Sequence, residues 1–489
     1  MRQLIEQRLS KLRELEKIGI NPFPYRFEVT TSSQKIKQDF ERLSESSEKV
    51  RIAGRLMAKR PHGKSCFGAI RDLYGDIQIY FRVDDLGSER FGLLDLIEIG
   101  DFVGVGGTVF RTRTGEITVR VEEFEILAKA IRPMPEKWHG LRDKETRYRQ
   151  RYVDLAFNVD VRKIFIKRSL VIRTIRSFLD QLGFLEVETP VLQPIYGGGN
   201  AEPFVTYYRA LDTKFYLRIA DELYLKRLLV GGLEKVYEIS KDFRNEGLDR
   251  FHSPEFTQLE LYQAYADYND MMVLFEKMVE RVAHEVNGST EITYQGVKMD
   301  LSPPWRRLTV RDALLKYANV DIEKANDDDL RRICEERCEG EWQKASRAEL
   351  IDELISHFVE PNLIEPTFLM DYPVETSPLA KVSRKDTRYA ERFEPFAFGV
   401  EIGNAFSELN DPIVQLENFK AQREGEVEQK EIDYDFVRAL EYGMPPAGGL
   451  GVGIDRLVMI LTDCHSIRDV ILFPQMRPEQ DLKEEFDGI

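Results

Sequence analysis

Acidic and aromatic side chains alternate with apolar ones in the segment KVYEISKDFRNEGLDRFHSPEFTQLELYQAYADY, residues 235–268. Its two halves predict strands joined by a polar loop. One face of the second strand would carry Phe256, Gln258, Glu260 and Tyr262. Burying the Glu260 carboxylate without a partner is costly, so we expect either the protein or a ligand to bring a cation. Arg244 and His252 flank the loop, and the planar fork of an arginine is suited to phosphate.

A second group of carboxylates lies in RFEPFAFGVEIGNAFSELNDP, residues 392–412. Glu394 and Glu401 lie symmetrically about Ala397 and Phe398, so a hairpin would bring them face to face. Paired carboxylates near phosphates usually hold Mg²⁺, a hard ion that prefers oxygen ligands. The sequence therefore indicates a Mg²⁺ site beside the phosphate-binding loop.

The end of the same segment predicts an acidic strand face. One side of the strand would carry Asn404, Phe406 and Glu408. Strict alternation places Glu401 on the opposite side of that strand. Gly403 is a candidate for a β-bulge, which would resolve the conflict.

A third segment, EYGMPPAGGLGVGIDRLVMILTD, covers residues 441–463. Its glycines precede a short apolar helix that contains Arg456. An arginine in such a helix is either paired with a neighbour, for which Asp455 is a candidate, or bound to an anionic ligand. The chain has no glycine-rich phosphate loop of the strand–loop–helix kind, so side chains such as Arg456 would have to hold a nucleotide.

The N-terminal part of the chain predicts a nucleic-acid-binding barrel. Residues 1–49 form a helical segment, in which an amphipathic helix over 1–18 ends at the prolines of NPFPYRF. Residues 50–130 contain five short strands, which suit a Greek-key barrel of the OB type. Such barrels bind single strands by stacking bases on aromatic side chains beside basic groups.

Charge gives a mixed indication of a nucleic-acid partner. The net charge of −15 argues against one. The first strands nevertheless carry six basic residues before any acidic one, Arg51, Arg55, Lys59, Arg60, Lys64 and Arg71. A local basic stripe can bind phosphates on an acidic protein, but a solvated sheet edge explains the same pattern.

The remainder of the chain predicts an α+β domain with an antiparallel sheet. We expect a linker over 131–150 and this second domain over 151–489, with a charged helical insertion at 310–360. Residues 161–182 form a helix whose apolar stripe consists of Val161, Phe165, Ile172, Ile175, Leu179 and Leu182. Gly183 is placed to cap that helix.

Length and composition exclude some classes of protein. The chain has 489 residues, no apolar run of the ~18 residues that span a bilayer and a charged N-terminus unlike a secretory signal. We therefore expect a cytoplasmic protein of two to four domains without a membrane partner. Cys334 and Cys338 lie four apart in RRICEERCEGEW. Because no further ligand is evident in the sequence, we interpret both as free thiols.

The three segments resemble the motifs of class II aminoacyl-tRNA synthetases. Arg244-Asn245-Glu246-Gly247 with Pro254-Glu255-Phe256-Thr257 is similar to motif 2, and Gly451 to Leu457 is similar to motif 3. GFLEVETPVL, with Pro190, is similar to motif 1, which builds a dimer interface in that family. The phrases LELYQAYADY, EIGNAFSELNDP and RALEYGMPP resemble lysyl-tRNA synthetases more than their aspartyl and asparaginyl relatives. The resemblance covers nearly the whole chain, including the barrel.

The resemblance implies a role for each matching residue. Arg244 and Arg456 would act in catalysis, and ATP would be bound by Arg244, Glu246, His252, Phe256 and Arg456. Mg²⁺ would be held by Glu394 and Glu401. The substrate lysine would be bound by Gly198, Glu222, Glu260, Tyr262, Asn404, Phe406 and Glu408. The barrel would read the anticodon with Phe67, Gln78 and Lys59.

The chain departs from the family pattern at three positions. Glu202 stands where the family usually has a basic residue, and Asp221 stands where a proline is usual. Lys59 stands where arginine is frequent. The first two put substrate affinity or the movement of the substrate loop in doubt, but neither is among the assigned ligands.

The resemblance implies a lysine–tRNA ligase that works as a homodimer. Such an enzyme uses ATP to convert L-lysine to lysyl-adenylate and transfers the lysine to the 3′ end of tRNA(Lys). The paralogue that lysylates elongation factor P lacks the barrel, and an aspartyl or asparaginyl enzyme does not fit Glu260 with Glu408. A regulatory RNA-binding paralogue on the same scaffold remains the alternative, although Arg244, Glu394, Glu401 and Arg456 are all present.

Overall fold

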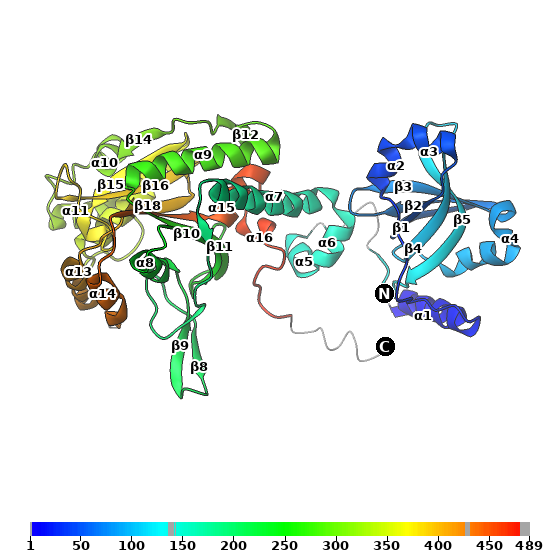
Figure 1. Ribbon diagram of the computed structural model, residues 1–489, viewed down its shortest axis with the longest axis horizontal. Helices are drawn as coiled ribbons and strands as arrows, with labels where there is room; N and C mark the ends of the chain where they lie inside the picture. The colour runs from blue at the N-terminus through cyan, green and yellow to red at the C-terminus, as the bar shows by residue number, and fades with distance from the viewer. Residues whose placement is uncertain (1, 135–140, 142, 426–430, 480–489) are drawn as a thin grey trace. The chain divides into compact units, whose positions relative to one another are not determined.

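The computed structural model describes residues 2–134, 141, 143–425 and 431–479 (Figure 1). The chain divides into two compact units, Met1–Arg147 with Tyr152–Val159, and Tyr148–Arg151 with Asp160–Ile489. No helix in the described part of the chain combines the length and apolar character needed to cross a bilayer.

Five strands close into a barrel in the first unit, in the order β1-β2-β3-β5-β4. They are β1 (Val50–His62), β2 (Ser65–Arg71), β3 (Asp76–Arg82), β4 (Phe102–Arg111) and β5 (Ile117–Ala128). Only the β3–β5 pair is parallel. The predicted five-stranded OB-type barrel is confirmed.

The helices of the first unit complete the barrel core. They are α1 (Arg2–Lys17), α2 (Ser33–Gln38), α3 (Phe40–Ser46) and, between β3 and β4, α4 (Val83–Gly92) with the 3₁₀ turn η1 (Leu93–Leu96). Leu15, Ile36 and Phe40 from the N-terminal helices share one apolar cluster with the inward-facing barrel residues. The amphipathic helix predicted over residues 1–18 is confirmed by α1.

Two short helices lie where the chain passes between the units. Part of the linker expected at 131–150 forms α5 (Lys144–Arg149), and α6 (Arg151–Phe157) follows it directly. Residues 135–140 and 142 of that linker lie outside the described residues. The boundary between the two units falls among these helices.

A nine-stranded sheet forms the centre of the second unit. Its order is β14 (Arg306–Thr309), β15 (Thr367–Pro373), β16 (Tyr389–Ala397), β18 (Gly403–Ser407), β19 (Ala447–Gly453), β11 (Glu255–Ala264), β10 (Lys235–Phe243) and β6 (Leu185–Glu186), with β17 (Val400–Glu401) paired to β16. All neighbours are antiparallel except β14–β15 and β10–β6. The predicted α+β architecture on an antiparallel sheet is confirmed.

Long helices cover one face of this sheet, as Figure 1 shows for α7 (Val159–Gln181) and α9 (Tyr268–Asn287). With α15 (Ile454–Thr462) they bury the largest apolar cluster of the unit. Ile172, Ile175 and Leu179, half of the predicted stripe on α7, pack in or against this cluster, but Leu182 is 42% exposed because the helix ends before it. Gly183 adopts φ +79°, as a helix cap requires, and Phe184 is buried instead.

Shorter elements lie on the other side of the sheet. They are α8 (Glu222–Val230), β7 (Leu192–Gln193), the hairpin of β8 (Val205–Tyr208) and β9 (Thr213–Leu217), α13 (Pro412–Gly425) and α14 (Tyr434–Glu441). In Figure 1 the β8–β9 hairpin projects well away from the sheet. The small β12 (Glu291–Tyr294) and β13 (Val297–Asp300) pair follows α9, and α16 (Ile467–Val470) follows α15.

The segment expected as a helical insertion folds around a core of its own. It contains α10 (Val310–Tyr317), α11 (Asp327–Arg337), α12 (Arg347–Leu354), a π-turn at Ile355–Val359 and a 3₁₀ turn at Glu360–Asn362. Buried leucines from three of these helices, among them Leu314, Leu330 and Leu350, form a separate apolar cluster. That cluster also includes Leu369 of β15 and Phe396 of β16, which attach the helices to the edge of the sheet.

Candidate active site

One large cavity in the second unit gathers the predicted active-site residues. Its volume is about 1090 Å³. It is lined by Gly198, Glu222, Arg244, Glu246, His252, Phe256, Glu260, Tyr262, Glu394, Glu401, Asn404, Phe406, Glu408 and Arg456. All candidates that the sequence indicated in this unit therefore meet in one place.

The alternation on β11 has the orientation predicted from the sequence. Leu259 and Leu261 are fully buried in the apolar cluster beneath the sheet, while Phe256, Gln258, Glu260 and Tyr262 line the cavity. The neighbouring strand β10 pairs Glu238 with Glu260. The sheet thus separates an apolar side from a polar ligand side.

The glycines of β19 are required by the side chains that cross over them. A Cβ atom on Gly449 would lie 1.9 Å from Glu408 Oε1 and 2.5 Å from a ring carbon of Tyr262. A Cβ atom on Gly451 would lie 2.8 Å from Glu260 Oε1. Sequence reasoning recognised these glycines only as the prelude to a helix and missed that they form the floor of the pocket. The dense run AGGLGVG was the available signal.

A bulge brings Glu401 toward the cavity. Phe396 pairs with Glu401 and Phe393 pairs with Ala405. An advance of three residues along β16 therefore lies opposite an advance of four residues along β17 and β18. The extra residue confirms the bulge expected at Gly403, where a Cβ atom would lie 2.3 Å from the Gly451 carbonyl oxygen. The expected pairing was wrong: Glu401 lies opposite Phe396, not opposite Glu394.

Glu394 and Glu401 both reach the cavity and already have protein partners. Glu394 accepts hydrogen bonds from Tyr372 (2.5 Å) and Arg392 (2.7 Å). Burial and the nearby Glu401 carboxylate raise the pKa of Glu394 to about 7, against the pull of Arg392. Glu401 Oε2 pairs with Arg456 at 2.8 Å.

Arg456 lies in the first turn of α15 and has a partner that the sequence did not reveal. Besides its ion pair with Glu401, its Nη2 lies 3.1 Å from His252 Nε2. The suggested pairing with Asp455 is wrong. Asp455 points to the other side of the helix, where it pairs with Arg168 at 2.5 Å and accepts the Thr257 backbone N–H.

Arg244 presents a guanidinium beside an aromatic ring. It lies 5.1 Å from the centre of the Phe256 ring, and its buried Nε has no hydrogen-bond partner among the described residues. A buried donor without a partner is costly. An anionic ligand in this part of the cavity would relieve that cost.

A buried lysine that sequence reasoning missed pairs with two acids that line the acidic end of this cavity. Lys226, on α8, is fully buried and forms ion pairs with Glu222 (2.6 Å) and Glu408. Burial favours its neutral form, but the two carboxylates outweigh burial and raise the pKa of Lys226. Glu408 therefore has a cation from the protein, which the sequence did not indicate. Its oxygens nevertheless accept no well-aligned hydrogen bond from the described residues.

Glu260 is the carboxyl group of this end that lacks an ion-pair partner among the described residues. It accepts hydrogen bonds from Tyr262 Oη (2.8 Å) and from Gln258. Burial, and then the negative charge of Glu222, raise the pKa of Glu260 to about 8. The group therefore holds a proton at neutral pH until a cation arrives.

The remaining pocket candidates frame these acids. Asn404 accepts a hydrogen bond from Arg392 at 3.0 Å, which leaves its amide nitrogen available. The ring of Phe406 lies 5.3 Å from Lys226 Nζ. Gly198 adopts φ +83°, and a Cβ atom there would lie within 3.2 Å of both Ala220 and Glu222.

Two departures from the family pattern have structural counterparts. Asp221 is fully buried beside Glu222, and neither of its carboxylate oxygens has a hydrogen-bond partner in the described part of the chain. Burial, with Asp242 and Glu260 nearby, raises the pKa of Asp221 well above its usual range. The backbone oxygen of Glu202 accepts the Asn245 N–H at 2.7 Å, which joins the substrate loop to the motif 2 segment.

The barrel carries an aromatic platform on its outer surface. Phe67 of β2 stacks on Tyr80 of β3 with ring centres 4.3 Å apart, and Phe110 lies 6.0 Å from Tyr80. Gln78 shares this face and donates to Thr118 at 2.9 Å. Lys59 points elsewhere, because its Nζ donates to the carbonyl oxygens of Leu94 (2.5 Å) and Ile97 (3.0 Å). Sequence reasoning missed Tyr80 and Phe110 as platform members.

A barrel of OB type and a cavity with paired acids and arginines on an antiparallel sheet together define a class of protein. The chain belongs to the family of tRNA synthetases class II (D, K and N), which matches residues 143–477. Residues 50–127 match the OB-fold nucleic acid binding domain.

Individual relatives share a more specific name. The lysine–tRNA ligase of Carboxydothermus hydrogenoformans is 54% identical over 483 residues, which are 98% of this chain and 99% of the relative. The lysine–tRNA ligase of Clostridium botulinum (strain Loch Maree / Type A3) is 52% identical, with 98% and 96% covered. That of Syntrophomonas wolfei is 52% identical, with 97% of each chain covered.

Proposed function

We propose that this chain is a lysine–tRNA ligase. It converts L-lysine and ATP to lysyl-adenylate and pyrophosphate, and then transfers the lysine to the 3′ end of tRNA(Lys). The observation that carries this proposal is the charge of the pocket. Three buried carboxyl groups, Glu222, Glu260 and Glu408, line it, and one buried ammonium among the described residues, Lys226, pairs with two of them.

L-Lysine has the charges that this pocket lacks. Its two ammonium groups match the excess of two acidic groups over Lys226. The α-ammonium binds at Gly198 and Glu222, and the ε-ammonium binds among Glu260, Tyr262, Asn404, Phe406 and Glu408. The lysine carboxylate meets Arg244, whose buried Nε has no hydrogen-bond partner within the described part of the chain. A neutral side chain such as that of methionine would leave the acids unpaired, which a polar site rejects strongly.

ATP occupies the other end of the cavity. Phe256 stacks on one face of the adenine, and the guanidinium of Arg456 covers the other face or contacts the γ-phosphate together with His252. Glu246 reads the adenine edge. Arg244 contacts the α-phosphate as well as the lysine carboxylate, so that it bridges the two reactants.

Mg²⁺ fits between Glu394 and Glu401. Each bonded oxygen of Glu394 keeps a second lone pair, and Glu401 Oε1 has no hydrogen-bond partner in the described ranges. Mg²⁺ usually takes one or two carboxylates together with substrate phosphates and water, which matches this donor set. When bound, the ion would neutralise phosphate charge during the reaction.

Positioning and charge stabilisation account for the first step without a protein base. A carboxylate oxygen of lysine attacks the α-phosphorus, the bond to the β-phosphate oxygen breaks, and pyrophosphate leaves with the electron pair. Arg244 stabilises the negative charge that develops on the α-phosphate oxygens. In the second step the 3′-terminal hydroxyl of the tRNA attacks the lysyl carbonyl carbon, and AMP leaves.

The barrel recognises the anticodon of tRNA(Lys). Phe67 stacks on a base, supported from beneath by Tyr80, and Gln78 offers an amide on the same face. Lys59, which the resemblance assigned to the anticodon, donates to the carbonyl oxygens of Leu94 and Ile97 and would support the η1 turn instead. Because its substrate is the tRNA of translation, we expect the enzyme to work in the cytoplasm.

Amino-acid-dependent exchange of pyrophosphate into ATP tests the proposed function. All twenty amino acids and ornithine are supplied one at a time to the full-length chain. We expect L-lysine to support exchange, ornithine to follow because it keeps the ammonium, and methionine to fail. Exchange with aspartate or asparagine would contradict the proposed substrate. Binding of tRNA(Lys) without any exchange would instead support the regulatory paralogue.

A further inference from the structure

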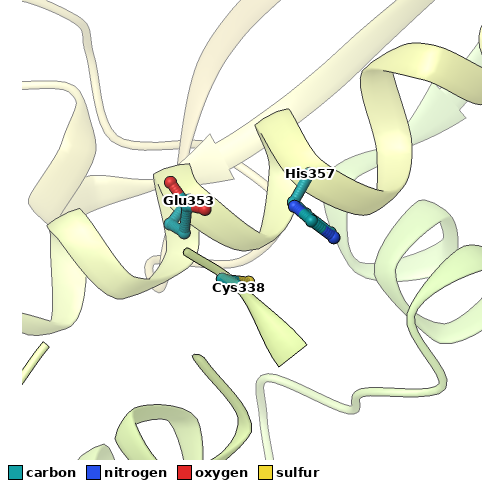
Figure 2. A group of neighbouring side chains, drawn as sticks. All are labelled: Cys338, Glu353 and His357. Atoms are coloured by element: carbon teal, nitrogen blue, oxygen red, sulfur yellow. The ribbon is translucent and has the colours of Figure 1, made fainter. Parts of the chain in front are cut away.

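A second group of possible metal ligands lies in the helical insertion, outside the active-site cavity. The ligand atoms of Cys338, Glu353 and His357 all lie within 4.8 Å of one another. Figure 2 shows Glu353 and His357 on neighbouring turns of one helix, both facing Cys338 on the segment below. Cys338 directly follows α11, Glu353 is on α12 and His357 is in the π-turn.

A fourth ligand adjoins this group. The Cys334 thiol, one turn before Cys338, interacts with the Cys338 thiol and with the Glu353 carboxylate. It is fully buried, and its Sγ lies 3.6 Å from the Leu350 carbonyl oxygen, a long contact for a thiol. The Cys334 thiol therefore adjoins the three ligand atoms that lie within 4.8 Å of one another, without belonging to that set.

The spacing of these residues has the form of a metal-binding motif. The pattern is C-x₃-C-x₁₄-E-x₃-H, in which two pairs, each four residues apart, are joined by a loop. Residues four apart lie on the same side of a helix, and two such pairs joined by a loop are typical of zinc sites. Sequence reasoning considered the cysteines alone and did not connect them with Glu353 and His357.

We propose that Cys334, Cys338, Glu353 and His357 bind one divalent transition-metal ion, of which zinc is the best fit. Thiolate and imidazole ligands favour zinc over Mg²⁺, and four protein ligands suit its tetrahedral preference. Tetrahedral ligands about 2.0–2.3 Å from zinc lie about 3.3–3.8 Å apart, so small side-chain rotations complete the site. His357 is exposed, which gives the ion a route in from solvent.

The surroundings of the cluster suit a structural ion. Arg337 lies beside Cys338, but its guanidinium donates to the Ala318 carbonyl oxygen at 2.8 Å and stacks on Phe358 at 4.2 Å. It can therefore offset the negative charge of the ligands without occupying their centre. Four protein ligands leave no open position for a substrate, which distinguishes this site from a catalytic one.

The ion would join α11 to α12, and α12 also borders the active-site cavity. Ser346, Arg347, Glu349 and Asp352 line that cavity, while Glu353 and His357 point to the cluster. Binding of the ion would thus hold one wall of the cavity in place. This inference does not depend on the proposed ligase activity, because metal binding is measured directly.

Metal content of the full-length protein tests the proposal. The protein is stripped with a chelator under reducing conditions, loaded with Zn²⁺ and dialysed before elemental analysis. We expect one ion per chain in the wild type, and loss of that ion in Cys338→Ser and in His357→Ala. The matched controls Cys66→Ser and His62→Ala change a cysteine and a histidine of the barrel, and should each retain the ion.

Cobalt gives a second readout, which reports the type of ligand as well as the presence of the ion. Co²⁺ bound to thiolates produces a sulfur-to-metal charge-transfer band, which we expect in the wild type and His62→Ala but not in Cys338→Ser. Equal metal content in the wild type and the His357→Ala variant, or cobalt binding without that band, overturns the proposal. A Cys334–Cys338 disulfide in protein kept under reductant overturns it as well, since oxidised sulfurs do not bind the ion.

Discussion

At the scale of single residues, the pocket is defined by an imbalance of charge. Lys226 satisfies part of the negative charge of Glu222 and Glu408, while Glu260 carries a proton. A second cation, such as an ammonium group of lysine, can therefore bind only if it replaces the proton on Glu260 or donates hydrogen bonds to carboxylate oxygens that have no partner. The sequence predicted the acids from their positions on strands, but it did not predict Lys226, because only the tertiary fold brings α8 over β18.

Glu408→Gln tests whether the excess of acidic groups in the pocket is needed to bind lysine. A hydrogen bond to a charged group is worth roughly 1.5–3 kcal/mol, so we expect kcat/KM for lysine to fall about 10- to 150-fold. The loss should lie toward the upper end, because the change also leaves Lys226 with one counter-ion fewer to face the substrate ammonium. ATP binding should change little. Pyrophosphate exchange measures the first effect and nucleotide titration the second, and wild-type lysine activity in the variant would exclude Glu408 from lysine binding.

The raised pKa of Glu260 predicts that lysine binding releases a proton. The groups that face this carboxyl are Tyr262 and Gln258 on its own strand, Glu222 on α8, Asp242 on β10 and, close by, Glu408. With a pKa of about 8 the free site is mostly protonated at pH 7. A bound ammonium favours the ionised form and lowers this pKa, so the complex holds fewer protons.

Isothermal titration calorimetry can measure this linkage. The Kd for lysine should fall as pH rises from 6 toward about 8, where the free carboxyl ionises, and then level off. At pH 7 the apparent enthalpy should depend on the ionisation enthalpy of the buffer with the sign of proton release. Glu260→Gln should abolish most of that dependence. Proton uptake on binding, or equal buffer dependence in the variant, would show that Glu260 does not meet the ammonium.

At the scale of elements, the alternation of side chains between the two faces of a strand was predictable from the sequence. The register in which neighbouring strands pair was not. The two faces of β11 follow from the period of two in any strand, so the sequence alone located Glu260 and Tyr262 on the ligand side. The pairing of Glu401 depends on the ladder between β16, β17 and β18, where one extra residue shifts every later partner. The glycines of β19 carry no periodic signal, and their function emerges only when Glu408 and Tyr262 are seen above them.

Gly449→Ala should damage the pocket without disturbing the nucleotide end. The new methyl group would overlap Glu408 Oε1 and the Tyr262 ring, and overpacking of a buried site typically costs about 1–3 kcal/mol. We expect a rise in KM for lysine with little change in ATP affinity, measured by exchange kinetics and nucleotide titration. Gly92→Ala in the barrel, where a Cβ atom would meet nothing within 4 Å and φ is −59°, is a control for the general effect of an added methyl group at a glycine. Equal KM values for lysine in the two variants would contradict the proposal that Gly449 forms part of the floor of the lysine pocket.

At the scale of the whole molecule, the two units have separate cores and separate tasks. The barrel encloses its own apolar cluster, and the catalytic cavity is lined by residues of the second unit alone. The sequence indicates a division of this kind, because the change from short strands to long amphipathic helices is a change of period. It could not predict the relation of side chains within each unit, such as the stacking of Phe67 on Tyr80, since that depends on strand register.

Phe67→Ala should weaken tRNA charging while sparing lysine activation. Stacking of one base on an aromatic ring is worth ~1–3 kcal/mol, so kcat/KM for tRNA(Lys) should fall about 5- to 150-fold. Lysine-dependent pyrophosphate exchange does not use the barrel and should stay at the wild-type rate. Phe23→Ala, which removes another partly exposed phenylalanine of the same unit, should leave both rates unchanged. Equal losses in charging and exchange would mean that Phe67 supports the fold instead of reading RNA.

The motif 1 segment leads us to expect a homodimer. Leu182, Leu185, Val191 and Leu192 are each between 39% and 50% exposed, and apolar side chains that gather on a surface mark an interaction site more often than a solvated face. A two-fold axis would let the same segment of each chain cover the other, which is the commonest symmetry of soluble oligomers.

Leu185→Asp with Leu192→Asp would place charges in that interface. We expect the wild type to sediment with the mass of two chains at micromolar concentration, and the double variant to sediment as one chain with lower activity. Leu211→Asp, at an exposed leucine between β8 and β9, serves as the control and should remain a dimer. A fully active wild-type monomer at micromolar concentration would show that motif 1 forms no dimer interface. The exposure of Leu182, Leu185 and Leu192 would then have to be explained by a different partner.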